Sequence, residues 1–353
     1  MPHHTKIVLC AVLLIGSALT ATTSAQKARA QKWKMATSWP GGPLMDHGAK
    51  AFAERVELLT DGRIRIQVFA AGVLGKPLKV SDTVRAGVAQ CGHTWIGYDW
   101  GKDRTAVLFG GYAGSFNTEV MLHWLYEGGG AELWAQWRQE NFKLVSRPLY
   151  TRTAEVFLHS HKRVETLEDL QGLKIRTVGA WLEIAKQLGA SPLASAGGEV
   201  YPMLDRKVID ATEWGTLWEN VSPGFHRITR YVIVPGVHQP TAPFELVING
   251  RAWKKLTPRD RKLVDLAAKM VTLESWLKVG HEDIGAYHFF RDQGNEIVVL
   301  SPEAQLKVKQ LGIEWAQRQA EGNDWFRKVF DHQRAYEERW KDAPAFRNPV
   351  TEP

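Results

Sequence analysis

The alternation of short apolar strands and helices near the start of the chain is the feature that most limits its fold. Residues 33–38, 63–69 and 90–96 each have the short apolar or alternating pattern of a strand. Helical patterns over 44–59 and 78–86 lie between them. A strand–helix–strand–helix–strand order is typical of a parallel sheet covered by helices. The sequence therefore predicts an α/β fold.

The rest of the chain predicts two lobes. Residues 258–290 form one uninterrupted helical pattern, which is too long to belong to a single small lobe. We expect residues 32–152 and 241–345 to build lobe I, and residues 153–240 to build lobe II. A chain that crosses between lobes more than once creates a hinge with a cleft beside it.

The first residues have the pattern of a secretory signal peptide. Lys6 precedes an apolar run over 7–21, and small residues follow it. This run is too short for a membrane span. We expect a signal peptide over 1–25, with cleavage as late as residue 30, and export to a bacterial periplasm. The mature chain would then keep one cysteine, Cys91, and could form no internal disulfide.

Composition and motifs exclude several classes of function. Apolar residues make up 44% of the chain, which supports large cores and argues against disorder. The 45 basic and 38 acidic residues are dispersed, and no basic run is interleaved with aromatic residues, so we expect no nucleic-acid partner. The sequence contains no Walker loop, HExxH, GxSxG or CxxC motif. We expect that the protein is not an enzyme.

One arginine stands at the end of a predicted strand. Residues 166–176, TLEDLQGLKIR, form a polar turn and then a short strand that ends at Arg176. An arginine on a rigid strand end can hold a carboxylate through two charge-assisted hydrogen bonds. An acidic–aromatic pair, Glu213 and Trp214, follows downstream. Taken alone, Arg176 is more simply interpreted as a surface arginine, and its neighbours along the chain change that balance.

Six segments taken together resemble the periplasmic solute-binding subunit of a TRAP transporter, of the DctP type that binds 2-oxo acids and other organic acids. The resemblance covers essentially the whole mature chain. It implies a two-lobed periplasmic binding protein with a parallel or mixed sheet in each lobe, a hinge cleft and a long lobe-spanning helix. It also implies delivery of a small organic acid to a sodium-driven membrane permease. The segments are KWKMATSWP, FAERVELLTDGRIRIQVFAAGVLG, LYEGGGAELW, ETLEDLQGLKIR, ATEWGTLWEN and APFELVING.

The resemblance also implies roles for single residues. Arg176 matches the family arginine that pairs with the ligand carboxylate. Glu213 and the backbone carbonyl of Trp214 match a metal site that bridges to the ligand, with Glu155 as a further ligand. Oxygen donors of this kind suit calcium or sodium, and no organic cofactor is implied. Glu245 occupies a position where an acid can accept the ligand's hydroxyl proton or support the metal site.

Glu155 departs from the pattern, because the resembled 2-oxo-acid binders carry a glutamine there. The carboxylate adds a negative charge to a site in which Arg176 is the expected cation. Burying an unpaired carboxylate costs several kcal/mol. A divalent ion, an amino group on the ligand or protonation of Glu155 would each balance this charge, and we rank calcium ahead of sodium.

Aromatic residues after strands are candidates for the cleft wall. Trp39, Tyr98 and Trp100 have this placement, although core packing explains each of them equally well. Asn117 is a candidate for a hydrogen bond to the ligand's tail.

Several alternatives stay open at this stage. A periplasmic acid–base enzyme would use Glu155, Glu213 and Glu245, and the ligand-capturing subunit of a sensor would look the same as a transport protein. A 2-oxo acid, a 2-hydroxy acid or an amino acid all fit as ligand. Some members of the resembled family exchange a C-terminal helix, and apolar stripes follow residue 302, so we expect a homodimer.

Overall fold

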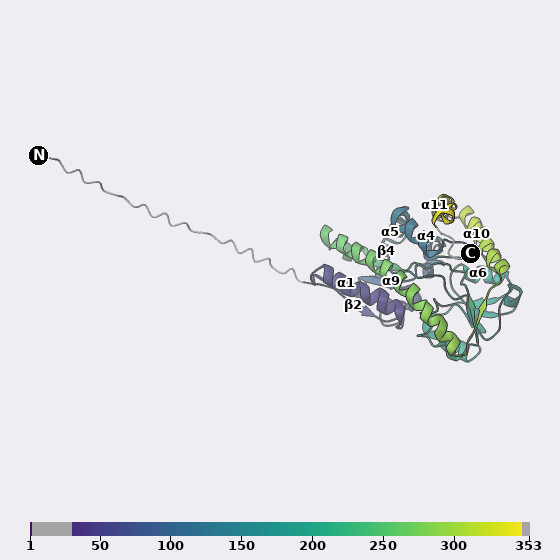
Figure 1. Ribbon diagram of the computed structural model, residues 1–353. Coiled ribbons are helices and arrows are strands. Elements are labelled where there is room, and N and C mark those ends of the chain that lie inside the picture. Colours follow the sequence, from purple (N-terminus) through teal and green to yellow (C-terminus); the bar gives the residue numbers. More distant parts are fainter. Residues whose placement is uncertain (2–29, 348–353) are drawn as a thin grey trace.

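Two mixed β-sheets form the framework of the protein (Figure 1). The structure is a computed structural model that describes Met1 and residues 30–347. The first sheet has the strand order β2-β1-β3-β10-β4 and the second β11-β9-β5-β8-β6-β7. The strands of the first sheet are β1 (Gln31–Thr37), β2 (Ile64–Phe69), β3 (Cys91–Thr94), β4 (Leu144–Pro148) and β10 (Glu245–Asn249). Those of the second are β5 (Leu158–Ser160), β6 (Lys174–Arg176), β7 (Ser191–Leu193), β8 (Ala211–Thr212), β9 (Tyr231–Val234) and β11 (Glu296–Val299).

Strand directions show how the chain passes between the sheets. Strand β1 pairs in parallel with β2 and β3, as the early strand–helix alternation predicts. Strand β10 returns antiparallel between β3 and β4. In the second sheet β6 is parallel to β7 and β8, whereas β5 is antiparallel to β8 and β9. The expected α/β fold with a mixed sheet in each half is confirmed.

Helices flank both sheets. A π-helical segment over Leu44–Lys50 leads into the first of them. The shorter helices are α1 (Ala51–Leu59), α2 (Val80–Arg85), α3 (Ala106–Gly110), α4 (Thr118–Glu127), α5 (Gly130–Phe142), α6 (Trp181–Gln187), α7 (Gly197–Asp205), α8 (Gly250–Lys254) and α12 (Ala343–Arg347). The longer ones are α9 (Pro258–Asp292), α10 (Pro302–Glu321) and α11 (Asp324–Trp340). No helix among residues 30–347 is long and apolar enough to cross a membrane.

Helix α9 joins the two halves of the molecule. Its 35 residues make it about 50 Å long. The side chain of Thr257 caps its first turn, where it accepts a hydrogen bond from the amide of Asp260. The helix packs against α1 and β4 near the first sheet and against β11 of the second (Figure 1). The predicted lobe-spanning helix is therefore present.

One part of the expected lobe division is wrong. The sequence analysis assigned residues 241–345 to lobe I, but β11 pairs in parallel with β9 in the second sheet. The length of α9 carries the chain across to this sheet before β11 begins. The chain then returns, because α11 packs against α3 and α4. The expected signal peptide lies almost wholly in residues 2–29, outside the described residues.

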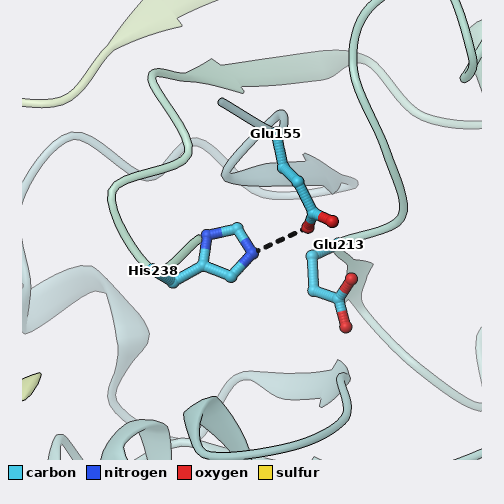
Figure 2. Close-up of side chains that lie close together, drawn as sticks. All are labelled: Glu155, Glu213 and His238. Carbon is cyan, nitrogen blue, oxygen red and sulfur yellow. Dashed lines mark hydrogen bonds and ion pairs between the residues drawn. The ribbon is translucent and has the colours of Figure 1, made fainter. Parts of the chain in front are cut away.

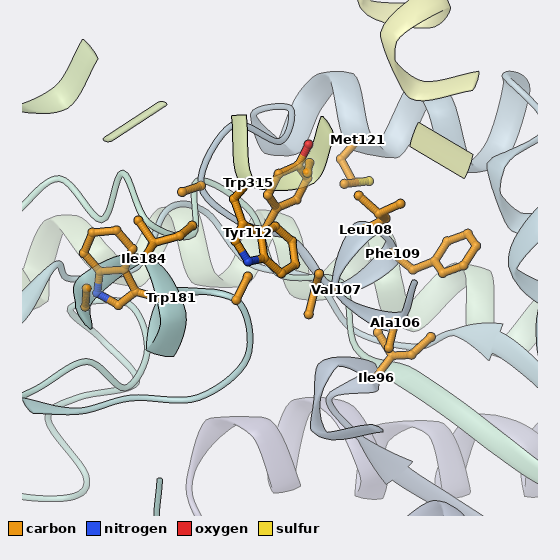
Figure 3. Close-up of a cluster of buried hydrophobic side chains, with 14 of the residues drawn as sticks. Ile96, Ala106, Val107, Leu108, Phe109, Tyr112, Met121, Trp181, Ile184 and Trp315 are labelled. Atoms are coloured by element: carbon orange, nitrogen blue, oxygen red, sulfur yellow. The ribbon is translucent and has the colours of Figure 1, made fainter. Parts of the chain in front are cut away.

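The largest buried cluster also connects the two halves. Trp181 and Ile184 of α6 belong to it together with Phe109 of α3, and Tyr112 and Trp315 lie between them (Figure 3). Each of these five side chains is at least 97% buried. An apolar core of this kind holds the C-terminal helices firmly onto both halves.

Candidate ligand and metal site

Residues from both sheets surround a small buried cavity, which we call the charged cavity. Its volume is about 20 Å³, close to the space that one water molecule needs. Strand ends and the segments that cross between the sheets supply the lining. The residues are Trp39, Leu44, Trp95, Tyr98, Arg152, Glu155, Arg176, Val178, Glu213, Trp214, Gln239 and Phe244.

Arg176 is the last residue of β6, and its side chain is 2% exposed. Its Nε and Nη2 atoms donate to the carbonyl of Ser195 at 3.2 and 2.8 Å, and Nη1 donates to Glu213 Oε1 at 3.2 Å. The guanidinium lies 5.5 Å from the centre of the Trp214 ring. These contacts fix the arginine in the cavity wall, at the strand end that the sequence predicted.

Glu213 directly follows β8, the strand that pairs with β6. This pairing sets Arg176 opposite Thr212 and so brings the next residue beside the guanidinium. Glu213 Oε1 also accepts a hydrogen bond from the amide of Val178 at 3.1 Å. The carboxylate is therefore oriented by both a charged and a backbone donor.

Glu155 approaches Glu213 from a crossing segment (Figure 2). Its backbone bridges to Gly236, where an added Cβ atom would lie 2.2 Å from the Glu155 carbonyl oxygen, so only glycine fits. The carboxylate forms an ion pair with Arg152, and His238 Nε2 donates to its Oε2 at 3.1 Å. Glu155 is thus a buried acid whose charge is matched by a guanidinium.

Glu155, Glu213 and His238 have ligand atoms that all lie within 4.8 Å of one another. Burial and the charge of Arg152 lower the pKa of His238 to about 3, so its imidazole is neutral at physiological pH. The two carboxylates are oxygen donors of the kind that calcium or sodium prefers, and the neutral imidazole orients Glu155 by donating to it. The backbone carbonyl of Trp214, the expected third ligand, accepts from Arg152 Nη2 at 3.3 Å.

A second charged pair was missed by the sequence analysis. Arg152 Nη1 donates to Glu219 Oε2 at 2.7 Å, and the hydroxyl of Tyr150 donates to Glu219 Oε1 at 2.7 Å. The guanidinium also lies 4.9 Å from the centre of the Phe244 ring. No motif marks these residues, because they meet only where the chain crosses between the sheets.

Two of the predicted aromatic residues line the cavity. Trp39 is buried, and its Nε1 donates to His93 Nδ1 at 2.9 Å. Tyr98 packs between Trp39 and Trp95. Burial raises the pKa of Tyr98, and the positive charge of Arg176 opposes this shift. Tyr98 is therefore a neutral hydrogen-bonding group beside the arginine.

Three other predicted residues do not line the cavity. Trp100 packs against Arg104, whose guanidinium carbon lies 5.6 Å from the centre of the Trp100 ring. Asn117 caps α4, where its side chain accepts from the amide of Val120. Glu245 lies in the core of the first sheet and accepts two 2.7 Å hydrogen bonds from Arg138. Each of these side chains already serves packing, capping or ion pairing, which explains its placement.

Known proteins resemble the chain over most of its length. The sequence profile of the family described as bacterial extracellular solute-binding protein, family 7 (DctP), matches residues 35–322. A relative from Nostoc sp., named monocarboxylate 2-oxoacid-binding periplasmic protein, is 29% identical over 332 residues, which are 92% of this chain and 89% of the relative.

Two solved structures have a similar fold. A TRAP periplasmic solute-binding protein from Pseudoalteromonas atlantica, with bound sodium and pyruvate, is 25% identical with a TM-score of 0.85, covering 91% of this chain and 98% of that one. A TRAP transporter solute-binding protein from Bordetella bronchiseptica is a mixed-occupancy dimer with copurified calcium and picolinate. It is 23% identical with a TM-score of 0.85, covering 90% and 94%.

Proposed function

Because the chain belongs to the family of bacterial extracellular solute-binding proteins, family 7, we propose that it captures a small carboxylate at the charged cavity for a TRAP transporter. It is a solute-binding receptor and not an enzyme. The alternative of an acid–base enzyme using Glu155, Glu213 and Glu245 is not supported, and Glu245 is paired with Arg138 in the core. The ligand would be a 2-oxo or 2-hydroxy acid, and 2-oxo acids are the class named for the Nostoc relative and bound, as pyruvate, in the Pseudoalteromonas protein.

The buried guanidinium of Arg176 is the observation that carries this proposal. A guanidinium held on a strand end presents fixed donors to an anionic ligand, and water is largely excluded around it. The charged cavity is too small in this conformation for an organic acid, so the two halves must move apart to admit one. Residues from both sheets would then close around the bound ligand.

A count of charges supports a metal ion in the same site. Glu155, Glu213 and Glu219 face two guanidiniums, Arg152 and Arg176. Three carboxylates against two cations leave one negative charge, and the ligand's carboxylate adds a second. A divalent ion would cancel both charges, whereas sodium would leave one. We therefore propose calcium ahead of sodium.

Glu155, Glu213 and the carbonyl of Trp214 would hold this ion, and His238, which donates to Glu155, would orient that carboxylate. When bound, it would supply the positive charge that attracts the ligand's oxygens. Arg176 would orient the ligand's carboxylate, and Glu213, which contacts both Arg176 and the proposed ion, would couple the two.

We also propose the cellular setting. The family is extracytoplasmic, so the chain would work in the periplasm after removal of a signal peptide and would deliver its ligand to a TRAP membrane permease. A homodimer is proposed as well, and light scattering at micromolar concentration would test it. A monomeric mass would contradict it.

Calorimetry tests the proposed binding function directly. Metal analysis and mass spectrometry of the purified protein should identify a bound carboxylate, and titration with pyruvate should give a measurable affinity. Arg176→Ala should weaken this affinity about thirtyfold or more, because it removes a buried charge-assisted pair. Arg259→Ala, on an exposed position of α9, serves as the matched control. Equal affinities of Arg176→Ala and wild type would remove Arg176 from the site.

A further inference from the structure

Helix α9 is apolar on two opposite faces. One face packs against α1, β4 and β11. The other face carries five of the thirteen exposed large apolar side chains among the described residues. Single apolar residues are common on protein surfaces, but five on one face of one helix form a patch. They are Leu266, Leu273, Leu277, Ile284 and Tyr287.

The spacing of this patch is that of a coiled-coil seam. From residue 263 to residue 287, an apolar residue or a glycine occurs at alternating intervals of three and four residues. Leu263, Met270 and Gly280 are half-buried and fill the positions that the five exposed side chains leave. We call this surface the α9 seam. Its members are Leu263, Leu266, Met270, Leu273, Leu277, Gly280, Ile284 and Tyr287.

The α9 seam is complementary to a second copy of itself. In an antiparallel pair whose two-fold axis lies level with Ser275, each seam residue would face another seam residue. A Cβ atom on Gly280 would have no atom within 4 Å, so the surface there has room for the long side chain of Met270. The facing pairs would be Leu263 with Tyr287, Leu266 with Ile284, Met270 with Gly280, and Leu273 with Leu277.

The size of the seam predicts a reversible dimer. The seam is about 36 Å long and a helix is about 11 Å wide, so it covers roughly 400 Å² of each protomer. A standard interface buries about 800 Å² per partner. A seam of about half that area, well matched in shape, should give a Kd in the micromolar range.

One acidic residue beside the seam is already neutralised. In the antiparallel pair, the Glu274 side chains of the two copies would lie near each other on one side of the axis. Arg55 Nη2 donates to both Oε1 and Oε2 of Glu274 at 2.9 Å within the same protomer. This ion pair offsets the repulsion between the two carboxylates.

The C-terminal helices offer less apolar surface to a second copy. Trp315 on α10 and Phe326 and Phe330 on α11 belong to the stripes that follow residue 302, and each is at least 94% buried. All three are part of the largest buried cluster. These side chains therefore pack within one protomer, whereas the five exposed residues of the α9 seam do not.

We propose that two copies of the protein associate through their α9 seams in an antiparallel arrangement. This inference rests on the homodimer proposed above and adds the surface through which it forms. The seam residues are not among those that line the charged cavity. Changes to the seam should therefore leave ligand affinity unaltered.

Sedimentation velocity between about 1 and 200 µM protein tests the inference. Leu277→Glu should weaken the dimer about thirtyfold or more, because it places charges in the central apolar layers. Leu277 is 66% exposed, so the variant should keep the wild-type circular dichroism spectrum and ligand affinity. Leu306→Glu on α10, at a position that is 70% exposed, is the matched control and should leave the dimer unchanged.

Two results would overturn the inference in different ways. Equal association of Leu277→Glu and wild type, or dissociation caused by Leu306→Glu alone, would remove the interface from α9 and leave the homodimer standing. A wild-type protein that stays monomeric at the highest concentration would overturn the homodimer as well. Neither result would affect the proposed capture of a carboxylate, which calorimetry measures separately.

Disulfide trapping tests the antiparallel register. A mixture of Leu266→Cys and Ile284→Cys proteins should form a linked dimer under oxidising conditions, because the two positions face each other. Either variant alone should stay unlinked on a non-reducing gel, since its two introduced thiols would lie about 27 Å apart. Cys91 is buried and does not compete. An unlinked mixture, or a linked dimer of Ile284→Cys alone, would overturn the antiparallel pairing.

Discussion

Glu155 is the residue whose charge decides which cation the site prefers. It is buried between Arg152 and His238, and Glu213 lies close enough to share an ion with it. With an organic acid bound, the contacting residues and the ligand carry two negative charges in excess. The preference for calcium over sodium follows from this excess and from no other feature of the donors.

Replacing Glu155 with glutamine should therefore shift the cation preference. Chelation should lower ligand affinity of the wild type, and calcium should restore it at least about tenfold better than sodium. Glu155→Gln removes one negative charge and keeps a hydrogen-bonding oxygen, so sodium should then restore affinity nearly as well as calcium. Calorimetry in chelated, sodium and calcium buffers measures both. The exposed Glu321→Gln is the control.

A different result would identify a different ligand. If chelation changes nothing and no metal copurifies, Glu155 would instead pair with an amino group on the ligand. The ligand would then be a zwitterion such as an amino acid, and the metal assignment would be wrong.

The sequence predicts some site residues better than others for a physical reason. Arg176 and Glu213 stand at the ends of paired strands, which local patterns indicate, and the family resemblance marks both as site residues. Arg152, Glu219 and His238 meet through long-range crossings that no local pattern reports. Likewise, no local pattern predicts that Glu245 forms an ion pair with Arg138, a buried arginine on α5.

At the scale of elements, two helical glycines should respond oppositely to the same change. Gly285 in α9 has no atom within 4 Å of an added Cβ, whereas on Gly312 in α10 this atom would lie 1.6 Å from the Ala113 carbonyl oxygen. Gly285→Ala should raise the free energy of unfolding by about 0.5–1 kcal/mol, because alanine favours the helix. Gly312→Ala should lower it by about 1–3 kcal/mol through overpacking. Urea unfolding measures both, and a neutral Gly312→Ala would show that α10 lies farther from residue 113.

Element boundaries were predictable where caps are strong and not where strands are short. The expected helix over 258–290 matches α9 closely, because Thr257 and Pro258 mark its start. The four residues of β11 lie between two long helices and were not recognised as a strand. Their pairing with β9 is a long-range contact, and it moves this part of the chain from lobe I to the second sheet.

At the scale of the whole molecule, buried histidines in both halves should make the stability of the folded protein depend on pH. His93 lies on β3 of the first sheet, His159 lies on β5 of the second, and His238 lies at the charged cavity. Burial lowers the pKa of each to about 3. Each is neutral in the folded protein across the physiological range, and each accepts or donates hydrogen bonds in that form.

These histidines should make the folded state lose stability in acid. Below about pH 6.5 the unfolded chain binds protons at these positions and the folded chain does not. The free energy of unfolding should therefore fall between about pH 6.5 and pH 3, by about 1.4 kcal/mol per pH unit for each histidine. Above pH 7.5 the three groups should cause no further change. Urea unfolding at pH 7.5, 6 and 5 measures this slope.

A single substitution separates this effect from general acid sensitivity. In His159→Gln the new amide oxygen can still accept a hydrogen bond from Asn220, but the side chain cannot bind a proton. The slope should then decrease by about 1.4 kcal/mol per pH unit. The exposed His281→Gln should leave the slope unchanged. If His159→Gln and wild type lose stability equally between pH 6.5 and 5, His159 must be protonated in the folded protein, and its burial does not hold it neutral.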